Sequence, residues 1–192
     1  KYKCTGEPFT CLKPVDDNAV KQSNDTPCRG DGVLHVRTEG KTTVKQNSYL
    51  GKDLDALFPT TFFMRVFVRL PSNTHIDNQK FFGVADDDGP DLSLVIGGEG
   101  EPLTAKWGTE DWVVVGGTKF KTDQWHCVEV EIAAKQISVH FDGTTASVKQ
   151  FSATLTSTWD YMGLGLYASN LTGPSELYFD DFVLSDNRIG CD

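Results

Sequence analysis

The chain has 192 residues, of which 39% are hydrophobic and 23% charged, so it is long enough for one packed domain and too apolar for general disorder. Its formal net charge of −9 argues against nucleic acid or an anionic membrane surface as the main partner. No apolar run approaches the roughly 20 residues that a membrane helix needs. No apolar segment follows the first four residues, so we expect a mature chain without a signal peptide.

Short apolar segments separated by turn signals run through the chain and predict β-strands. The clearest spans residues 62–70 (FFMRVFVRL), in which alternate residues are apolar throughout. Only residues 52–58 suggest a helix, of one or two turns. The predicted strands are residues 33–37, 62–70, 80–85, 92–96, 111–115, 126–132, 136–141, 162–168 and 176–184.

Two of these strands are close enough in sequence to form a hairpin. The turn Ala133-Ala134-Lys135 separates them, and the second strand ends in Phe141-Asp142-Gly143, so we expect an antiparallel pair over residues 126–143. So many strands with almost no helical pattern predict an all-β fold of two packed antiparallel sheets.

The five cysteines indicate an oxidising compartment. No CxxC pair exists and no histidine stands at zinc-finger spacing, so a structural zinc site is not expected. Cys191 follows a polar turn after the last strand, where it can bridge to a neighbouring strand. We therefore expect a Cys127–Cys191 disulfide and one N-terminal disulfide that includes Cys28. With the glycosylation sequons at Asn24 and Asn170, these bridges indicate a secreted protein.

The strand at residues 62–70 carries a candidate binding surface. Its second face presents Phe63, Arg65, Phe67 and Arg69. Rings that stack on sugars, beside guanidinium groups that bind hydroxyls or carboxylates, suit a polysaccharide. Alternatively, the phenylalanines lie under a covering loop and the arginines pair with acids; the sequence leaves both open. Trp107 and Trp112 flank a polar turn and are candidates for the rim of such a groove, although tryptophans equally pack under loops.

Acidic residues offer candidates for a hard cation. Asp180 and Asp181 interrupt an apolar strand, and alternation sends one carboxylate toward the interior, where it needs a donor or a metal. This makes Asp180 a better calcium ligand than the acidic turn at residues 86–91, which lacks a full calcium-loop spacing. Glu129 and Glu131 share one strand face, which we interpret as solvated or salt-bridged.

No motif of nucleophilic hydrolysis is present. The four histidines show neither triad nor metal spacing, and GxSxG and HExxH are absent. No motif selects a pair of carboxylates for a glycosidase. Arg29-Gly30-Asp31 matches the tripeptide that integrins bind, so an adhesive surface protein is a further alternative.

Several segments together resemble a known family. Residues 178–182 (YFDDF), 187–191 (NRIGC), 124–129 (QWHCVE) and 96–98 (IGG), with Gly163 and Tyr167, resemble the secreted cellulose-induced proteins of wood-degrading fungi and their bacterial relatives. The resemblance covers about residues 29–192 and leaves residues 1–28 poorly matched. It implies one domain over residues 1–192 with a two-sheet β-jelly roll, a concanavalin-like sandwich similar to glucuronan and alginate lyases.

The resemblance also implies particular site residues. It implies the Cys127–Cys191 disulfide and a structural Ca²⁺ ion held by Asp180. Further ligands come from the N-terminal strand and from the turn at residues 29–32, where Asp31 is the candidate.

In the lyase-like cleft the chain departs from the family. The resemblance implies His, Arg and Gln on and just after the strand that precedes Gly97-Gly98, whereas this chain has Ser93, Val95 and Glu99. A lyase must neutralise the uronate carboxylate and needs a base, and the arginine of the family is missing here.

Two functions therefore lead the expectations. The first is a secreted, calcium-stabilised protein, expected to be a monomer, that binds plant or microbial cell-wall polysaccharide through a concave sheet face. The residues expected on that face are Phe63, Arg65, Phe67, Arg69, Trp107, Trp112 and Tyr167. The second is a polysaccharide lyase that cleaves a uronic-acid polymer by β-elimination, with Tyr167 as base and Arg65 or Arg69 as neutraliser.

Overall fold

A computed structural model describes the chain over residues 10–11, 19–23, 28–29, 33–38, 46–53, 61–74, 79–85, 92–96, 103–107, 110–113, 119–150, 161–168 and 173–192. Within these ranges the regular elements are strands, and no helix there is long and apolar enough to cross a membrane. The all-β prediction is confirmed.

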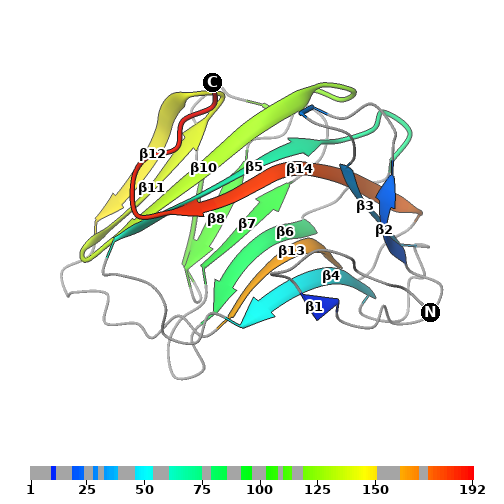
Figure 1. Cartoon of the computed structure of the whole chain (residues 1–192), viewed down its shortest axis with the longest axis horizontal. Helices are drawn as coiled ribbons and strands as arrows, with labels where there is room; N and C mark the ends of the chain where they lie inside the picture. The colour runs from blue at the N-terminus through cyan, green and yellow to red at the C-terminus, as the bar shows by residue number, and fades with distance from the viewer. Residues whose placement is uncertain are drawn as a thin grey trace.

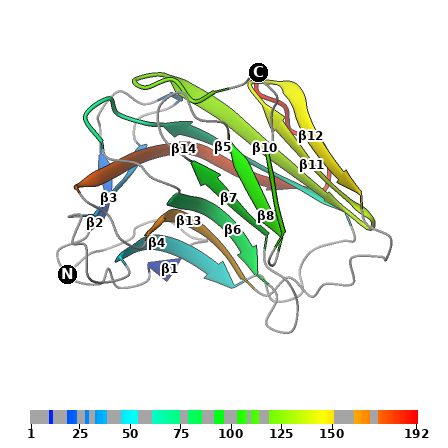
Figure 2. The same cartoon turned by 180° about the vertical axis from the view of Figure 1, so that it is seen from behind.

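The strands form two seven-stranded antiparallel sheets, which lie as two layers in Figures 1 and 2. Sheet A has the order β1-β4-β13-β6-β7-β8-β9 and sheet B the order β12-β11-β10-β5-β14-β3-β2. The strands of sheet A are β1 (Thr10–Cys11), β4 (Gln46–Asp53), β6 (Gln79–Ala85), β7 (Leu92–Ile96), β8 (Thr104–Trp107), β9 (Glu110–Val113) and β13 (Tyr161–Ala168). The strands of sheet B are β2 (Ala19–Ser23), β3 (Val33–Thr38), β5 (Phe62–Arg69), β10 (Trp125–Ala133), β11 (Gln136–Phe141), β12 (Thr144–Gln150) and β14 (Ser175–Ser185).

The hydrophobic core lies between the sheets, because strand alternation turns one apolar face of each sheet toward the other. The alternate apolar residues of the predicted strand at 62–70 are all buried there: Phe62, Met64, Val66 and Val68 on β5, and Leu70 just after it. Sheet A contributes Leu92 and Leu94 from β7 and Leu164 and Leu166 from β13.

Most predicted strands are present, and β7 and β11 have the predicted bounds. The β10–β11 hairpin is confirmed by the pairing of Ala133 with Gln136. The helix expected over residues 52–58 is wrong where it can be checked, because residues 52–53 belong to β4; residues 54–58 lie outside the described residues. Strands β1, β2, β4, β8 and β12 were not predicted.

A bulge in β14 changes which way its acidic residues face. The pairing with β5 shifts between Asp180 and Val183, and Asp181 has a φ of +45°. Phe179 therefore stays in the core while Asp180 pairs with Phe67 on the outer face. The prediction of an inward carboxylate is wrong, because strict alternation fails at the bulge.

Candidate functional site

Each sheet has an outer face, directed away from the core, and the predicted binding residues are divided between the two sheets. Phe63, Arg65, Phe67 and Arg69 lie on β5 in sheet B. Tyr167, Trp107 and Trp112 lie on β13, β8 and β9 in sheet A. Because the sheets pack back to back across the core, these two groups cannot line one groove.

The outer face of sheet A has a row of small residues across four adjacent strands. Gly163 on β13 pairs with Gly51 on β4 and with Gly83 on β6. Gly83 pairs in turn with Ser93 on β7, and Ser93 with Lys106 on β8. Glycine has no side chain to stand above the sheet, and Gly83 is partly exposed, so a ligand can approach the backbone at that position; Gly163 and Ser93 are buried.

Two lysines lie beside this row. Lys106 continues it on β8, and Lys80 lies three residues before Gly83 on β6, where it pairs with Val95 and with Tyr167. Both lysines are partly exposed. The side chain of Tyr167 lies outside the described residues; its register places it on β13 two positions along from Gly165 and directly opposite Lys80.

The outer face of β7 is not bare. Ser93 and Val95 alternate with the core residues Leu92 and Leu94, yet they are only 5% and 1% exposed. Solvent therefore reaches little of β7 at these two positions, where the resemblance implied a histidine and an arginine. Glu99 lies outside the described residues.

The two tryptophans expected at a groove rim lie on the neighbouring strands β8 and β9. Trp107 is partly buried and packs against the hydrophobic core, so the alternative of a packed tryptophan applies to it. Trp112 pairs with Ala105, but its side chain lies outside the described residues.

On the outer face of sheet B, the centre of β5 is covered. Arg65 is 5% exposed, and its guanidinium donates to Asp181 Oδ2 at 2.7 Å and to the carbonyl of Gly190 at 3.0 Å. Phe67 is buried beneath Arg29, whose Cζ lies 4.8 Å from the ring centroid. Phe67 is thus covered and Arg65 is paired with an acid, which is the alternative to a binding surface that the sequence left open. Other residues of the same chain occupy the space above both side chains.

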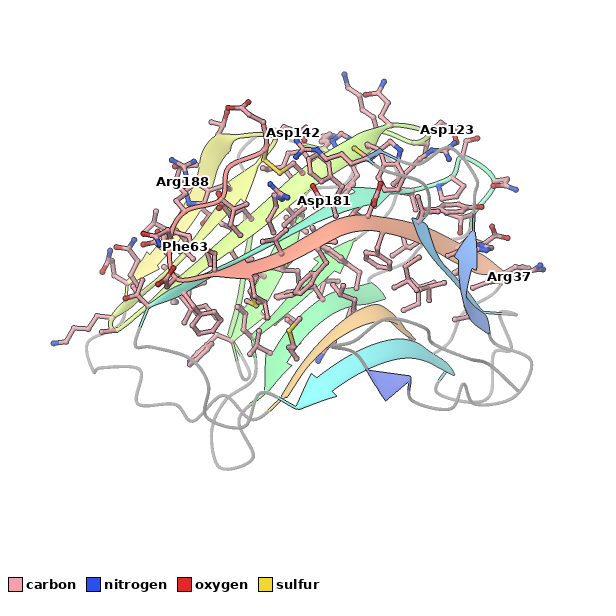
Figure 3. The ribbon with its side chains drawn as sticks, in the orientation of Figure 1. Arg37, Phe63, Asp123, Asp142, Asp181 and Arg188 are labelled. Carbon is pink, nitrogen blue, oxygen red and sulfur yellow. A yellow bond between two sulfur atoms is a disulfide. The ribbon has the colours of Figure 1, made fainter. Side chains whose placement is uncertain are left out.

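Toward the ends of β5 the side chains are more accessible. Arg69 lies over the ring of Tyr178, with Cζ 5.6 Å from the ring centroid, and its Nη2 lies 3.6 Å from Asp123 Oδ1. Phe63 is partly exposed and pairs with Glu131 on β10. Figure 3 shows Phe63 and Asp123 well apart along sheet B.

The cover on sheet B is the C-terminal segment, residues 186–192, which we call the C-terminal strap. Figure 1 shows it in red, turning back from the end of β14 across β11 and β10. The Cys127–Cys191 disulfide fixes it to β10, as predicted. The carbonyl of Cys191 also accepts a hydrogen bond from Arg29 Nη2 at 2.9 Å.

Glu129 holds the middle of the strap. Its side chain is 0% exposed, and Oε1 accepts the backbone N–H groups of Ile189 at 2.7 Å and Gly190 at 3.1 Å. Oε2 lies 3.4 Å from Arg188 Nε. Gly190 has a φ of +74°, which a side chain rarely allows. The sequence predicted a solvated or salt-bridged face here, and at Glu129 the solvated alternative is wrong because the side chain is buried. The sequence contains no signal that Glu129 receives the strap, because its partners lie 59 to 61 residues away.

The carboxylates of β14 already have donors. Asp180 accepts the backbone N–H of Arg29 at 2.7 Å through Oδ2 and that of Asp181 at 2.7 Å through Oδ1. Asp181 Oδ2 is shared by Arg65 and by Arg29 Nη1, the latter at 3.2 Å. Since Arg29 is engaged within the chain, the described residues give the integrin-type tripeptide no support; Gly30 and Asp31 lie outside them.

The described residues supply one part of a calcium site at most. Ca²⁺ takes about six to eight oxygen ligands, and among these residues no three His, Cys, Asp or Glu side chains are grouped to hold a metal. Asp180 is partly buried and keeps further lone pairs, so it fits as one ligand. Asp31 and the acidic turn at residues 86–91 lie outside the described part of the chain.

Cys28 carries a free thiol, so the expectation that Cys28 takes part in an N-terminal disulfide is wrong. Burial raises the pKa of this thiol above its ordinary value, and the nearby Asp180 carboxylate raises that pKa further. The thiol is therefore protonated at neutral pH and a poor nucleophile.

Comparisons with known proteins address the fold. No family model matches the chain, and no curated protein matches its sequence. The solved structure of a cellulose-induced protein, Cip1, is 14% identical, with 96% of this chain and 93% of that chain covered and a TM-score of 0.73. An endo-beta-1,4-glucuronan lyase from the fungus Trichoderma reesei is 13% identical, with 93% and 91% covered and a TM-score of 0.73. Alginate lyase A1-II′, a member of polysaccharide lyase family 7, is 16% identical, with 85% and 82% covered and a TM-score of 0.61.

At these identities the likeness establishes the fold. The chain has the two-sheet jelly roll of the cellulose-induced protein and of the lyases, which are the proteins that the sequence resembles.

Proposed function

We propose that the chain binds a cell-wall polysaccharide on the outer face of sheet A. The observation that carries the proposal is the partly exposed Gly83 on β6, which lies in the row Gly163–Gly83–Ser93 and has no side chain to cover the strand there. Lys80 and Lys106 beside the row are partly exposed donors for sugar hydroxyls or carboxylates. The jelly-roll neighbours named for glucuronan and alginate lyases support a polysaccharide as the ligand class.

The outer face of sheet B is not part of this proposal. Arg65 and Phe67 are covered by the strap and by Arg29, so a glycan cannot reach them without displacing the chain's own contacts. Arg65 and Arg69 also lie on the wrong sheet to act beside Tyr167.

A polysaccharide lyase is the second candidate, favoured by the register of Tyr167 with Lys80. In this scheme Tyr167 removes the proton next to the uronate carboxylate. The electron pair of that C–H bond forms a C=C bond as the glycosidic C–O bond breaks, and the leaving oxygen takes a proton. Lys80 or Lys106 replaces Arg65 or Arg69 as the cation that stabilises the carboxylate.

The first test separates the two candidates. Purified protein is incubated with cellulose, xylan, pectin, glucuronan and alginate, while co-sedimentation measures binding and ultraviolet absorbance measures the unsaturated product. Binding without absorbance supports the binding protein. Rising absorbance with one uronan, abolished in Tyr167→Phe, supports the lyase. Absence of both from a folded protein contradicts the proposed function.

Secretion and structural calcium complete the proposal. The Cys127–Cys191 disulfide supports an oxidising, extracellular setting. Calcium rests on the resemblance and on the spare lone pairs of Asp180. Thermal unfolding with Ca²⁺ and with chelator tests it: we expect Ca²⁺ to raise the Tm of the wild type and of Asp192→Asn, but not of Asp180→Asn. Identical Tm values of the wild type in both conditions contradict the calcium site.

A further inference from the structure

His140 on β11 lies buried at the edge of the C-terminal strap. It is 5% exposed, and its Nδ1 lies 3.1 Å from Thr145 Oγ1 on β12 and 3.3 Å from Arg188 Nη2 in the strap. Because a guanidinium only donates, Nδ1 must accept, and the ring is neutral with its proton on Nε2. Within the described residues no hydrogen-bond partner reaches Nε2.

Arg188 connects this imidazole to the carboxylate that holds the strap. Its Nε lies 3.4 Å from Glu129 Oε2, and Glu129 Oε1 binds the next two backbone N–H groups of the strap. The Arg188 side chain is 52% exposed, so it can leave for solvent at little cost. Figure 3 shows Arg188 beside β10 and β11, at the far end of sheet B from Arg37.

We propose that His140 is a pH sensor for the strap: protonation of Nδ1 removes the acceptor of Arg188 and releases that side chain from His140 and Glu129. The imidazolium then takes the place of the guanidinium beside Glu129. The charged groups that act on His140 are Glu129 and Glu131 on β10 and Arg188 in the strap; Thr145 on β12 is neutral.

The balance of these groups favours the neutral ring at pH 7. Burial, and then the Arg188 charge, hold the pKa of His140 below its ordinary value of 6.5, although Glu129 and Glu131 act in the opposite direction. The strap is therefore closed at neutral pH and loosens at Arg188 in acid, while the disulfide keeps its end attached to β10.

An NMR titration of the labelled protein tests the sensor. The signals are the His140 Cε1–Hε1 group, the Arg188 Nε–Hε group and the Ile189 amide. We expect all three to shift with one midpoint below pH 6.5. Arg188→Gln should raise the His140 midpoint, because it removes the cation that opposes protonation. Lys135→Gln, which removes an exposed cation in the hairpin turn, should leave that midpoint unchanged.

His140→Gln should abolish the pH dependence of the Arg188 and Ile189 signals near that midpoint. Strap signals that stay constant while His140 titrates in the wild type would overturn the proposal. So would an Arg188→Gln variant with an unchanged His140 midpoint. These two outcomes need no His140 variant, so the proposal is tested even if that variant does not fold.

Discussion

At the scale of single residues, Glu129 joins the strap to sheet B through both of its carboxylate oxygens. A fully buried carboxylate with two backbone N–H donors and a guanidinium neighbour is satisfied only while the strap is in place. Replacing the carboxylate by an amide leaves the two backbone N–H donors with a weaker, uncharged acceptor. It also places a side-chain NH₂ group beside these donors.

We therefore predict that Glu129→Gln lowers the free energy of unfolding by about 2 kcal/mol. Glu131→Gln is the matched control, because Glu131 lies two residues along the same face of β10 and is partly exposed. Urea denaturation followed by fluorescence measures both. Equal losses in the two variants would show that Glu129 has no special part in holding the strap.

His140 gives stability a pH dependence whose sign follows from its lowered pKa. In the unfolded chain the imidazole takes up its proton near 6.5, whereas in the folded chain it does so only at lower pH. Between these two values the unfolded state binds more protons, so stability falls as the pH falls through this window. Urea midpoints across this range should fall less in His140→Gln than in the wild type; parallel curves would be evidence against the lowered pKa.

At the scale of elements, the strap combines a covalent bond with polar contacts. The disulfide joins residues 64 apart in the chain, so it restricts the unfolded state strongly. On the loop-entropy relation, the double variant Cys127→Ser/Cys191→Ser should lose about 4 kcal/mol of stability.

Because Glu129 and Arg65 also bind the strap, we expect this double variant to keep the fold at neutral pH. Near-ultraviolet circular dichroism should show native tertiary structure, and the urea midpoint should fall. A variant as stable as the wild type would mean that the disulfide adds nothing to the polar contacts.

A strand could be predicted from the sequence where one of its faces packs into the hydrophobic core. In β5, β7 and β11 every second residue is apolar and buried, so the period of two was visible. Strand β4 (QNSYLGKD) and strand β12 (TTASVKQ) are mostly polar and show no such period, so sequence alone missed them. The bulge at Asp180 and Asp181 also has no signal in the alternation, which is why the carboxylate was expected to face inward.

At the scale of the whole molecule, sequence could name candidate residues but not the sheet that each one occupies. Phe63, Arg65, Phe67 and Arg69 look like a binding stripe on an isolated strand. The strap that covers Arg65 begins more than 100 residues later, and Arg29, which covers Phe67, precedes the strand by more than 30 residues. Likewise, the row of Gly163, Gly83 and Ser93 becomes a row only through antiparallel register.

The measurement that most directly tests polysaccharide binding on sheet A compares two small-to-large substitutions on opposite faces. Gly83→Phe places a ring in the glycine row, whereas Val148→Phe enlarges an exposed residue on β12, in sheet B. For the polysaccharide that the wild type binds best, we predict that Gly83→Phe raises the Kd at least about tenfold, or 1.4 kcal/mol. We predict that Val148→Phe leaves the Kd unchanged and that both variants keep the wild-type fold. If Gly83→Phe binds like the wild type, or if Val148→Phe alone loses binding, the outer face of sheet A is not the binding site.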